Sequence, residues 1–248
     1  MSMNIEESTL NSILKSVLER IFENKTFRDL SNFQRRQCVF NYLVNNNEYD
    51  FSLLNDIYSG KKREYANEIT SVLNPEVKNK GTCNGFSYAY KLLLDKLQIP
   101  CMLTICYILE DTVKDLEDKG INTNTTMIER SSGGQYMIPH MLVLVQNEDG
   151  TFSFDDITYA IANKGTEREQ DYFNYNYQTA KQSKQVNLEG FDTFMLRFIV
   201  NNSKDTKSDI VFREKYQEEA ESGFLTIPID LVKSYKESSK AEDLEEVR

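Results

Sequence analysis

The first third of the chain has apolar residues at every third or fourth position, the spacing of a helix with one buried face. This spacing predicts helices over residues 4–24 and 32–45, and the polar stretch "NNNEYD" ends the second one. A third helix is expected over residues 61–73, because Asn74-Pro75 ends it. After Cys83 the apolar residues again fall at i, i+3, i+4 and i+7, which predicts a helix packed on the core.

Short apolar runs in the middle of the chain predict strands over residues 99–109, 140–145 and 151–158. The turn "NEDG" between the last two favours a hairpin, since Asp-Gly accepts the positive φ of a tight turn. Further strands or apolar runs are expected at 191–200, 208–212 and 224–232. The predicted fold is of the α+β class, with a helical N-terminal part packed on an antiparallel sheet.

The chain divides into three expected parts. These are an N-terminal helical extension over residues 1–30, a main domain over 31–212 and a C-terminal extension over 213–248. Inside the main domain, residues 110–139 are polar and show little periodicity, and a connection of this length is usually functional or mobile. It is either a lid over a cleft or an insertion, and the sequence favours neither.

Composition narrows the classes of partner. The 248 residues carry 29 basic and 39 acidic side chains, and this net charge of -10 argues against binding to nucleic acid or to anionic membranes. No apolar run is long enough to span a membrane, and the charged N-terminus does not resemble a signal peptide. We therefore expect a cytoplasmic protein, with a secreted effector as the alternative. The 4 cysteines form no CxxC pair and there is 1 histidine, so we expect reduced thiols, no metal site and no cofactor.

One of these cysteines has the setting of a nucleophile. In "NKGTCNGFSYAYKLLLDKL", Cys83 lies where a Gly-rich turn enters a helix, and the partial positive charge of a helix N-terminus favours a thiolate. The N–H groups of the first turn could stabilise an oxyanion, and Gly81 and Gly85 would let a substrate backbone approach. Such a cysteine also needs a base, and the single histidine, His140, begins a predicted strand.

The base needs an acid to orient it, and the next strand offers two. A hairpin turning near residues 147–150 brings position 140 opposite roughly 156–158. Alternation along the strand puts Asp156 on the buried face with Phe152 and Phe154, and leaves Asp155 to solvent. Asp156 is therefore the expected partner of His140. Taken singly, a cysteine, a histidine and an aspartate in these positions each have an ordinary structural explanation.

Taken together, these segments resemble a known family. "GTCNGFSYAYKLLLDKLQIPC" and "HMLVLVQNEDGTFSFDDIT" are similar to the motifs of the transglutaminase-like superfamily, whose members share a papain-like thiol-enzyme core. Asp156-Ile157-Thr158 fits the Asp-x-Thr motif of that family and selects Asp156 a second time. The resemblance covers about residues 35–160. It departs at Met141-Leu142, where the family usually has Ala-Trp, and the chain has no tryptophan.

The resemblance implies acyl transfer through a thioester on a protein or peptide substrate, with Cys83, His140 and Asp156 as a catalytic triad. Tyr49, Asn84 and Gly81 are weaker candidates for contacts with the substrate or its oxyanion, beside the backbone N–H of Cys83. Hydrolysis by a cysteine protease or amide hydrolase is favoured, because bacterial members of the superfamily are more often interpreted as proteases. A cross-linking transglutaminase and a catalytically inactive binding module are the alternatives. The sequence predicts no oligomeric state.

Overall fold

The N-terminal part is helical, as its apolar spacing predicts. The structure, a computed structural model, describes residues 7–23, 27–61, 65–74, 79–118, 129–130, 134–182, 193–197, 224–228 and 231–236. Its first half contains α1 (Glu7–Phe22), η1 (Phe27–Asp29), α2 (Asn32–Asn46), β1 (Asn47–Tyr49), α3 (Phe51–Tyr58), α4 (Tyr65–Leu73), β2 (Asn79–Gly81) and α5 (Cys83–Lys96). The helices expected over 32–45 and after Cys83 are confirmed, and those over 4–24 and 61–73 are confirmed within the described residues.

Helix α3 was not predicted, because the stretch "NNNEYD" indicated only a break. Asp50, the last residue of that stretch, caps α3, since its side chain accepts a hydrogen bond from the Leu53 N–H at 2.9 Å. The three residues before it form β1, which pairs in parallel with β2. This short pairing matters for the site, because α5 begins two residues after β2 ends.

The second half contributes the sheet. It contains β3 (Cys101–Glu110), α6 (Val113–Asp118), β4 (Glu129–Arg130), β5 (Tyr136–Gln146), β6 (Phe152–Asp155), α7 (Ile157–Ala162), η2 (Glu169–Tyr172), α8 (Tyr177–Gln182), β7 (Thr193–Arg197) and β8 (Phe224–Pro228). Strand β5 pairs antiparallel with β3, β4 and β6, so the predicted antiparallel sheet is confirmed. The expected strand at 208–212 lies outside the described residues.

The predicted hairpin is also confirmed, with one correction at its end. The Asn147 N–H donates to the Thr151 carbonyl at 2.8 Å, and Gly150 has the positive φ of 80° that the turn requires. The strand expected over 151–158, however, ends at Asp155. Asp156 is the N-cap of α7, where its side chain accepts from the Tyr159 N–H at 3.0 Å. An aspartate at this point ends the strand because it starts a helix.

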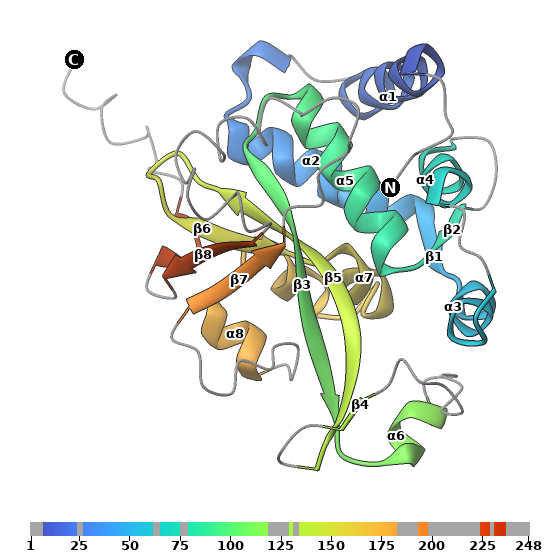
Figure 1. Cartoon of the computed structure of the whole chain (residues 1–248). Helices are drawn as coiled ribbons and strands as arrows, with labels where there is room; N and C mark the ends of the chain where they lie inside the picture. Colours follow the sequence, from blue (N-terminus) through green and yellow to red (C-terminus); the bar gives the residue numbers. More distant parts are fainter. Residues whose placement is uncertain are drawn as a thin grey trace.

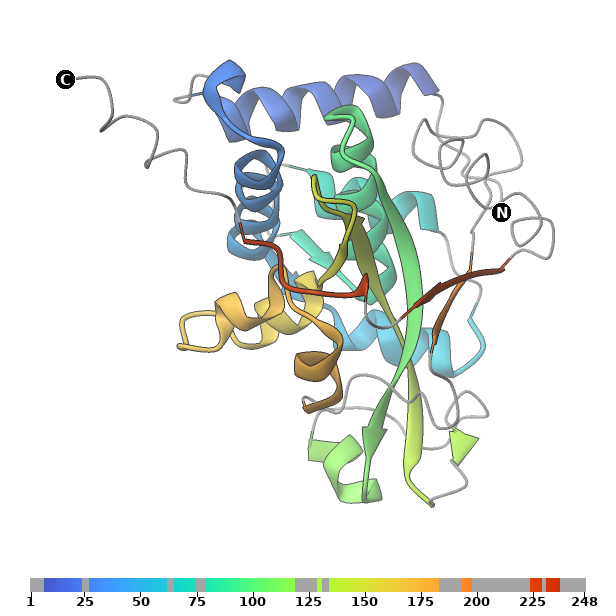
Figure 2. The same ribbon diagram turned by 90° about the vertical axis from the view of Figure 1, so that its left-hand side faces the viewer.

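Both faces of the sheet are covered. Alternate residues of β5 point to opposite sides: Met141, Val143 and Val145 join the core formed with α1, α2, α4, α5 and α7. Leu142 and Leu144 join a second core with Phe152 and Phe154 of β6, near α8 and Val232. Figures 1 and 2 show these layers, with the helices α1, α2, α4 and α5 on one side of β3 and β5 and the pair β7–β8 on the other.

The C-terminal part contributes directly to the second core. The Lys233 N–H donates to the Phe152 carbonyl at 2.7 Å, and Val232 forms a parallel bridge with Phe152. Residues 231–236 therefore lie along β6. The division into 1–30, 31–212 and 213–248 stays a prediction, although α1 already places Leu14 and Val17 in the first core.

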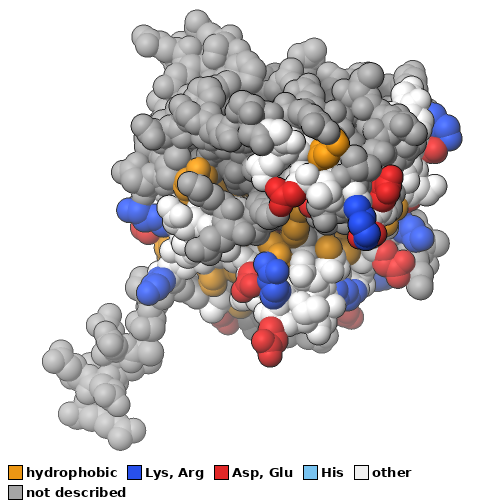
Figure 3. All heavy atoms as spheres, turned by 90° about the horizontal axis from the view of Figure 1, so that it is seen from below, with side chains coloured by type: hydrophobic (Ala, Val, Ile, Leu, Met, Phe, Trp, Pro, Cys, Tyr) orange, Lys and Arg blue, Asp and Glu red, His pale blue; other side chains and the backbone are white. Residues whose placement is uncertain are grey.

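The connection over residues 110–139 is partly regular. Its described residues include the ends of β3 and β5, together with α6 and β4, and Figure 1 shows them extending away from the main helical layer. A role as a lid stays a prediction. Viewed toward this end, basic and acidic side chains of the described residues are interspersed, with small hydrophobic areas between them (Figure 3). Among the described residues, no helix has the length and apolar character needed to span a membrane.

Candidate active site

Cys83 occupies the first position of α5. Thr82 before it is the N-cap and has extended backbone angles, φ −105° and ψ 179°. Cys83 is 7% exposed, and its thiol donates a long hydrogen bond of 3.5 Å to the Asn84 side-chain oxygen. Cys83 is therefore held at a helix N-terminus, as the sequence predicts, and is accessible only through a small part of its surface.

One face of α5 attaches it to the sheet. Ser87 lies one turn after Cys83 and donates from Oγ to the Met141 carbonyl at 2.9 Å. Tyr90, a further turn along, donates from its hydroxyl to Oδ2 of Asp155 at 2.7 Å. Since residues at i, i+4 and i+7 share a helix face, these two bonds turn Cys83 toward β5 beside His140. The sequence signal was a serine and a tyrosine on an apolar stripe, and sequence reasoning missed it.

His140 and Asp156 form a buried pair. The two atoms His140 Nε2 and Asp156 Oδ2 are 2.7 Å apart, and the residues are 3% and 0% exposed. The Tyr159 ring meets the imidazole edge-on, with centroids 5.5 Å apart. The Tyr159 N–H also donates to Asp156. The first turn of α7 therefore fixes both the Asp156 carboxylate and the Tyr159 ring beside His140. The prediction that Asp156 lies next to His140 is confirmed.

The charge on His140 follows from these neighbours. Burial by itself lowers the pKa of the imidazole, but the negative charge of Asp156 and hydrogen bonds to Asp156 and Cys83 outweigh it. The net result is a pKa raised to about 10. With Nε2 facing Asp156, Nδ1 is the nitrogen left for Cys83. The structure thus brings Cys83, His140 and Asp156 together, with the ring protonated at neutral pH.

A second thiol near this site has a different environment. Cys106 of β3 is the register partner of His140 on β5, but it is buried in the second core. Burial raises the pKa of Cys106 well above its ordinary value, and the charges of Asp156 and Cys83 raise it further. Cys106 therefore stays a thiol, and it does not lie at a helix N-terminus. None of the 4 cysteines forms a disulfide within the described part of the chain.

Asp155 is not exposed to solvent, which corrects the prediction from alternation. It is 0% exposed and receives two bonds from Arg36 of α2, from Nε and Nη2, each at 2.5 Å. Tyr90 donates to it as well, and so does the Asn174 N–H at 2.8 Å. The alternation itself is correct. The error was to assume that one face of the strand meets water, whereas α2 and α5 cover the face that carries Asp155.

The remaining predicted site residues lie near Cys83, and their roles as substrate contacts stay predictions. Tyr49 pairs in register with Gly81 and packs on Phe51 and Phe86, with ring centroids 4.7 and 6.3 Å away. A Cβ on Gly81 would lie 2.6 Å from Val72, so internal packing is sufficient to explain that glycine. Asn84 contacts the thiol, as described above.

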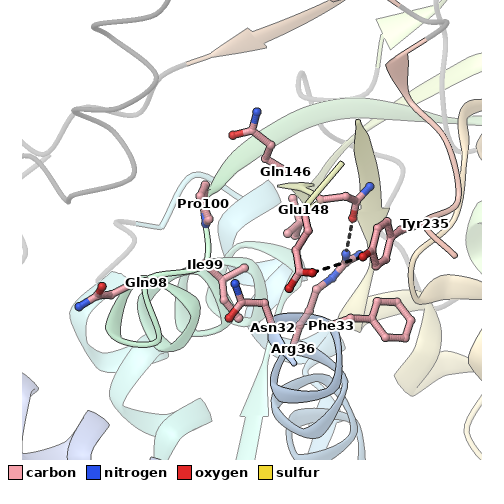
Figure 4. A pocket seen from close by; sticks show the side chains of 11 residues that line it. Asn32, Phe33, Arg36, Gln98, Ile99, Pro100, Gln146, Glu148 and Tyr235 are labelled. Carbon is pink, nitrogen blue, oxygen red and sulfur yellow. Dashed lines mark hydrogen bonds between the residues drawn. The ribbon is translucent and has the colours of Figure 1, made fainter. Parts of the chain in front are cut away.

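A pocket lies at the other end of β5, away from these residues. It has a volume of about 300 Å³ and opens between the start of α2 and the β5–β6 turn, with Asn32, Gln146, Glu148 and Tyr235 among its lining side chains (Figure 4). Val145 lines it and is five residues from His140, a span of roughly 17 Å along a strand. The pocket is therefore separate from the candidate active site. Among the described residues, no three His, Cys, Asp or Glu side chains are grouped so that they could hold a metal ion.

Comparisons with known proteins give little beyond this geometry. No protein-family model matches the sequence, and no curated protein matches it. A solved structure described as the crystal structure of a TGase is similar to this chain, with 14% identity and a TM-score of 0.41. The match covers 69% of this chain and 38% of that one, so the chain corresponds to less than half of that protein's length.

Proposed function

We propose that this chain is a thiol-dependent acyl-transfer enzyme with a transglutaminase-like, papain-like core. Its substrate is a peptide bond or a side-chain amide, its acceptor is water, and the reaction is that of a cysteine protease or amide hydrolase. The observation that carries the proposal is the buried contact of His140 with Asp156 on one side and Cys83 on the other, at the N-terminus of α5. The sequence motifs around the three residues support the same assignment.

The reaction starts from an ion pair in which the thiol proton of Cys83 is already on His140. Asp156 stabilises this imidazolium, and the raised pKa of His140 keeps the ring protonated at neutral pH. The Sγ thiolate then attacks the amide carbonyl and forms a C–S bond. The backbone N–H of Cys83, at the N-terminus of α5, would stabilise the oxyanion.

Collapse of this intermediate breaks the C–N bond, and His140 gives its proton to the leaving nitrogen. The product is a thioester on Cys83 and a free amine. Neutral His140 then takes a proton from water as the water oxygen attacks the thioester. The C–S bond breaks, the carboxylic acid leaves, and the thiolate of Cys83 with the proton on His140 restores the starting ion pair.

The first experiment measures the reactivity of each cysteine toward iodoacetamide by peptide mass spectrometry between pH 5 and 9. We expect Cys83 to react well at pH 6 and Cys106 to stay inert, and His140→Ala to remove the reactivity of Cys83 at that pH. Cys38→Ala is the matched control, since Cys38 lies on α2 outside the site. A Cys83 that reacts like an ordinary thiol, or that ignores the loss of His140, would contradict the proposal and favour an inactive binding module.

The second experiment identifies the acceptor. Casein and a set of peptide amides are incubated with the protein, with and without a biotinylated primary amine. New termini or released ammonia that disappear in Cys83→Ala identify hydrolysis. Incorporation of biotin that exceeds hydrolysis would replace water by an amine as the acceptor, and the chain would then be a cross-linking enzyme.

A further inference from the structure

A buried carboxylate from another helix lies under the first turn of α5. Glu68 of α4 is 5% exposed, and its Oε1 accepts hydrogen bonds from the Thr82 N–H at 2.7 Å and the Gly85 N–H at 3.3 Å. The Thr82 hydroxyl donates to the same oxygen. Two donors of Thr82, before Cys83, and one of Gly85, after it, therefore converge on one oxygen atom of Glu68.

These bonds explain two features of the cysteine motif. Thr82 is the N-cap of α5 but makes no capping bond with its side chain, because its hydroxyl turns to Glu68 instead. Gly85 lies so close to Glu68 that a Cβ at this position would be 2.6 Å from Glu68 Cγ and 2.8 Å from Oε1. Gly85 is thus needed for the approach of the Glu68 side chain, whereas from the sequence we expected it to allow the approach of a substrate.

The position of the carboxylate has an electrostatic consequence. A helix N-terminus carries a partial positive charge that stabilises nearby anions, and here Glu68 uses part of that stabilisation before Cys83 does. Its negative charge also opposes a second negative charge at the same helix N-terminus, which Cys83 begins. Glu68 therefore has two opposing effects at Cys83: its hydrogen bonds fix the helix turn that carries the thiol, while its charge opposes another anion at the same helix terminus.

We propose that Glu68 is a positioning residue for Cys83 that also restrains the reactivity of the thiol through its charge. The inference rests on the proposed function, because it takes Cys83 to be the nucleophile. It extends that function by adding a residue outside the triad, on a helix that sequence analysis did not connect with the site.

The test is the alkylation profile of Cys83 in Glu68→Gln. Glutamine keeps the size of the side chain and an oxygen that can accept from Thr82, but it removes the charge. We expect alkylation by iodoacetamide at pH 6 to be about threefold to tenfold faster than in the wild type, with the gain shrinking as the pH rises. The matched control is Glu48→Gln, which neutralises an exposed carboxylate on β1.

The outcomes separate this inference from the proposed function. If wild-type Cys83 depends on His140 but Glu68→Gln leaves its profile unchanged or slows it at all pH values, Glu68 is merely structural and the inference is wrong. Failure of Glu68→Gln to fold, measured by thermal melting, would show that the charge serves the fold and would also overturn the inference. If wild-type Cys83 lacks the dependence on His140, the proposed function itself has failed.

Discussion

Asp155 and Asp156 are neighbours in the sequence, but they lie in two different kinds of polar site. Asp155 is saturated by Arg36, Tyr90 and the Asn174 N–H, and Arg36 donates in addition to Asn147 and Ser153. Asp156 contacts the His140 imidazole and accepts from the Tyr159 N–H, and the imidazole in turn faces a thiol.

The two sites differ in whether the cationic side chain, Arg36 or His140, can release its proton. Burial by itself lowers the pKa of Arg36, but the charge and hydrogen bonds of Asp155 outweigh it, so the guanidinium stays charged at every ordinary pH. His140 can lose its proton and regain it. The first pair therefore serves the fold alone, while the second is suited to moving a proton. The same substitution, aspartate to asparagine, should separate the two roles.

The largest effect on stability is expected from Asp155→Asn. It leaves the buried guanidinium of Arg36 without a countercharge, and breaking a buried ion pair from one side typically costs about 3–5 kcal/mol. Denaturant unfolding at pH 7 measures the loss. Asp171→Asn, in an exposed pair with Arg168, is the control and should change little. A cost for Asp155→Asn no larger than that of the control would mean that the pair does not stabilise the fold.

Asp156→Asn should cost less, and its cost should depend on pH. Asparagine can still cap α7, and His140 can become neutral, so we expect a loss of about 2 kcal/mol near pH 6. The raised pKa of His140 stabilises the fold fully below its unfolded value of about 6.5, and this stabilisation is lost as the pH rises toward about 10. The difference between Asp156→Asn and the wild type should therefore shrink between pH 6.5 and 10.

Over the same pH range the cost of Asp155→Asn should stay constant, because Arg36 does not titrate there. Unfolding curves for both variants at pH 6, 8 and 10 make the comparison directly. Parallel pH profiles for the two variants would contradict the assignment of different roles to the two aspartates.

For the reactivity of the Cys83 thiol we expect the opposite order: Asp156→Asn should have a larger effect than Asp155→Asn. In Asp156→Asn the imidazolium loses its countercharge, so the pKa of His140 falls toward its ordinary value of about 6.5. Alkylation of Cys83 should therefore slow, most clearly near neutral pH, where the ring stays protonated in the wild type and becomes largely neutral in the variant. Asp155→Asn should keep a near-normal rate under conditions where it is folded. Peptide mass spectrometry after a short exposure to iodoacetamide gives both rates. Equal losses in the two variants would indicate a general disturbance of the sheet.

The smallest effect is expected from Ser87→Ala. It removes the hydrogen bond from α5 to the Met141 carbonyl and should cost about 1 kcal/mol. Because this bond lies one turn from Cys83, the rate of alkylation at pH 6 should fall as well, although no charge has changed. Ser153→Ala, which removes a hydroxyl from the Arg36 network, is the comparison at the other site. A rate that falls in Ser153→Ala and not in Ser87→Ala would contradict the role assigned to the bond.

The sequence predicted the parts of this arrangement that depend on local spacing. Alternation along β6 placed Asp156 with His140, and the Asp-Gly turn set the register of the hairpin. The environment of Asp155 could not be predicted in the same way, because it depends on which helices cover the second face of the sheet. One signal was available: Arg36 is three residues after Phe33 and four before Phe40, on the apolar stripe of α2, and a charge there needs a buried partner.

Other contacts could not be predicted because they are long-range. Nothing near Glu68 in the sequence indicates Thr82 or Gly85, which lie 14 and 17 residues further along. Strand β5 begins at Tyr136, before the predicted start at residue 140, and Pro139 pairs in register with Tyr107. In both cases the tertiary partner, rather than the local sequence, decides the structure.

The distance along the chain between Arg36 and Asp155, 119 positions, has a consequence for the order in which the protein is made. Helices α2 and α5 leave the ribosome long before β6, so the thiol of Cys83 is synthesised before either residue that would activate it. Long-range pairings of this kind form late in folding. We therefore expect nascent chains that stop before residue 155 to carry a Cys83 that reacts like an ordinary thiol. The proposed pairing of Cys83 with His140 and Asp156 would then form only when the sheet is complete.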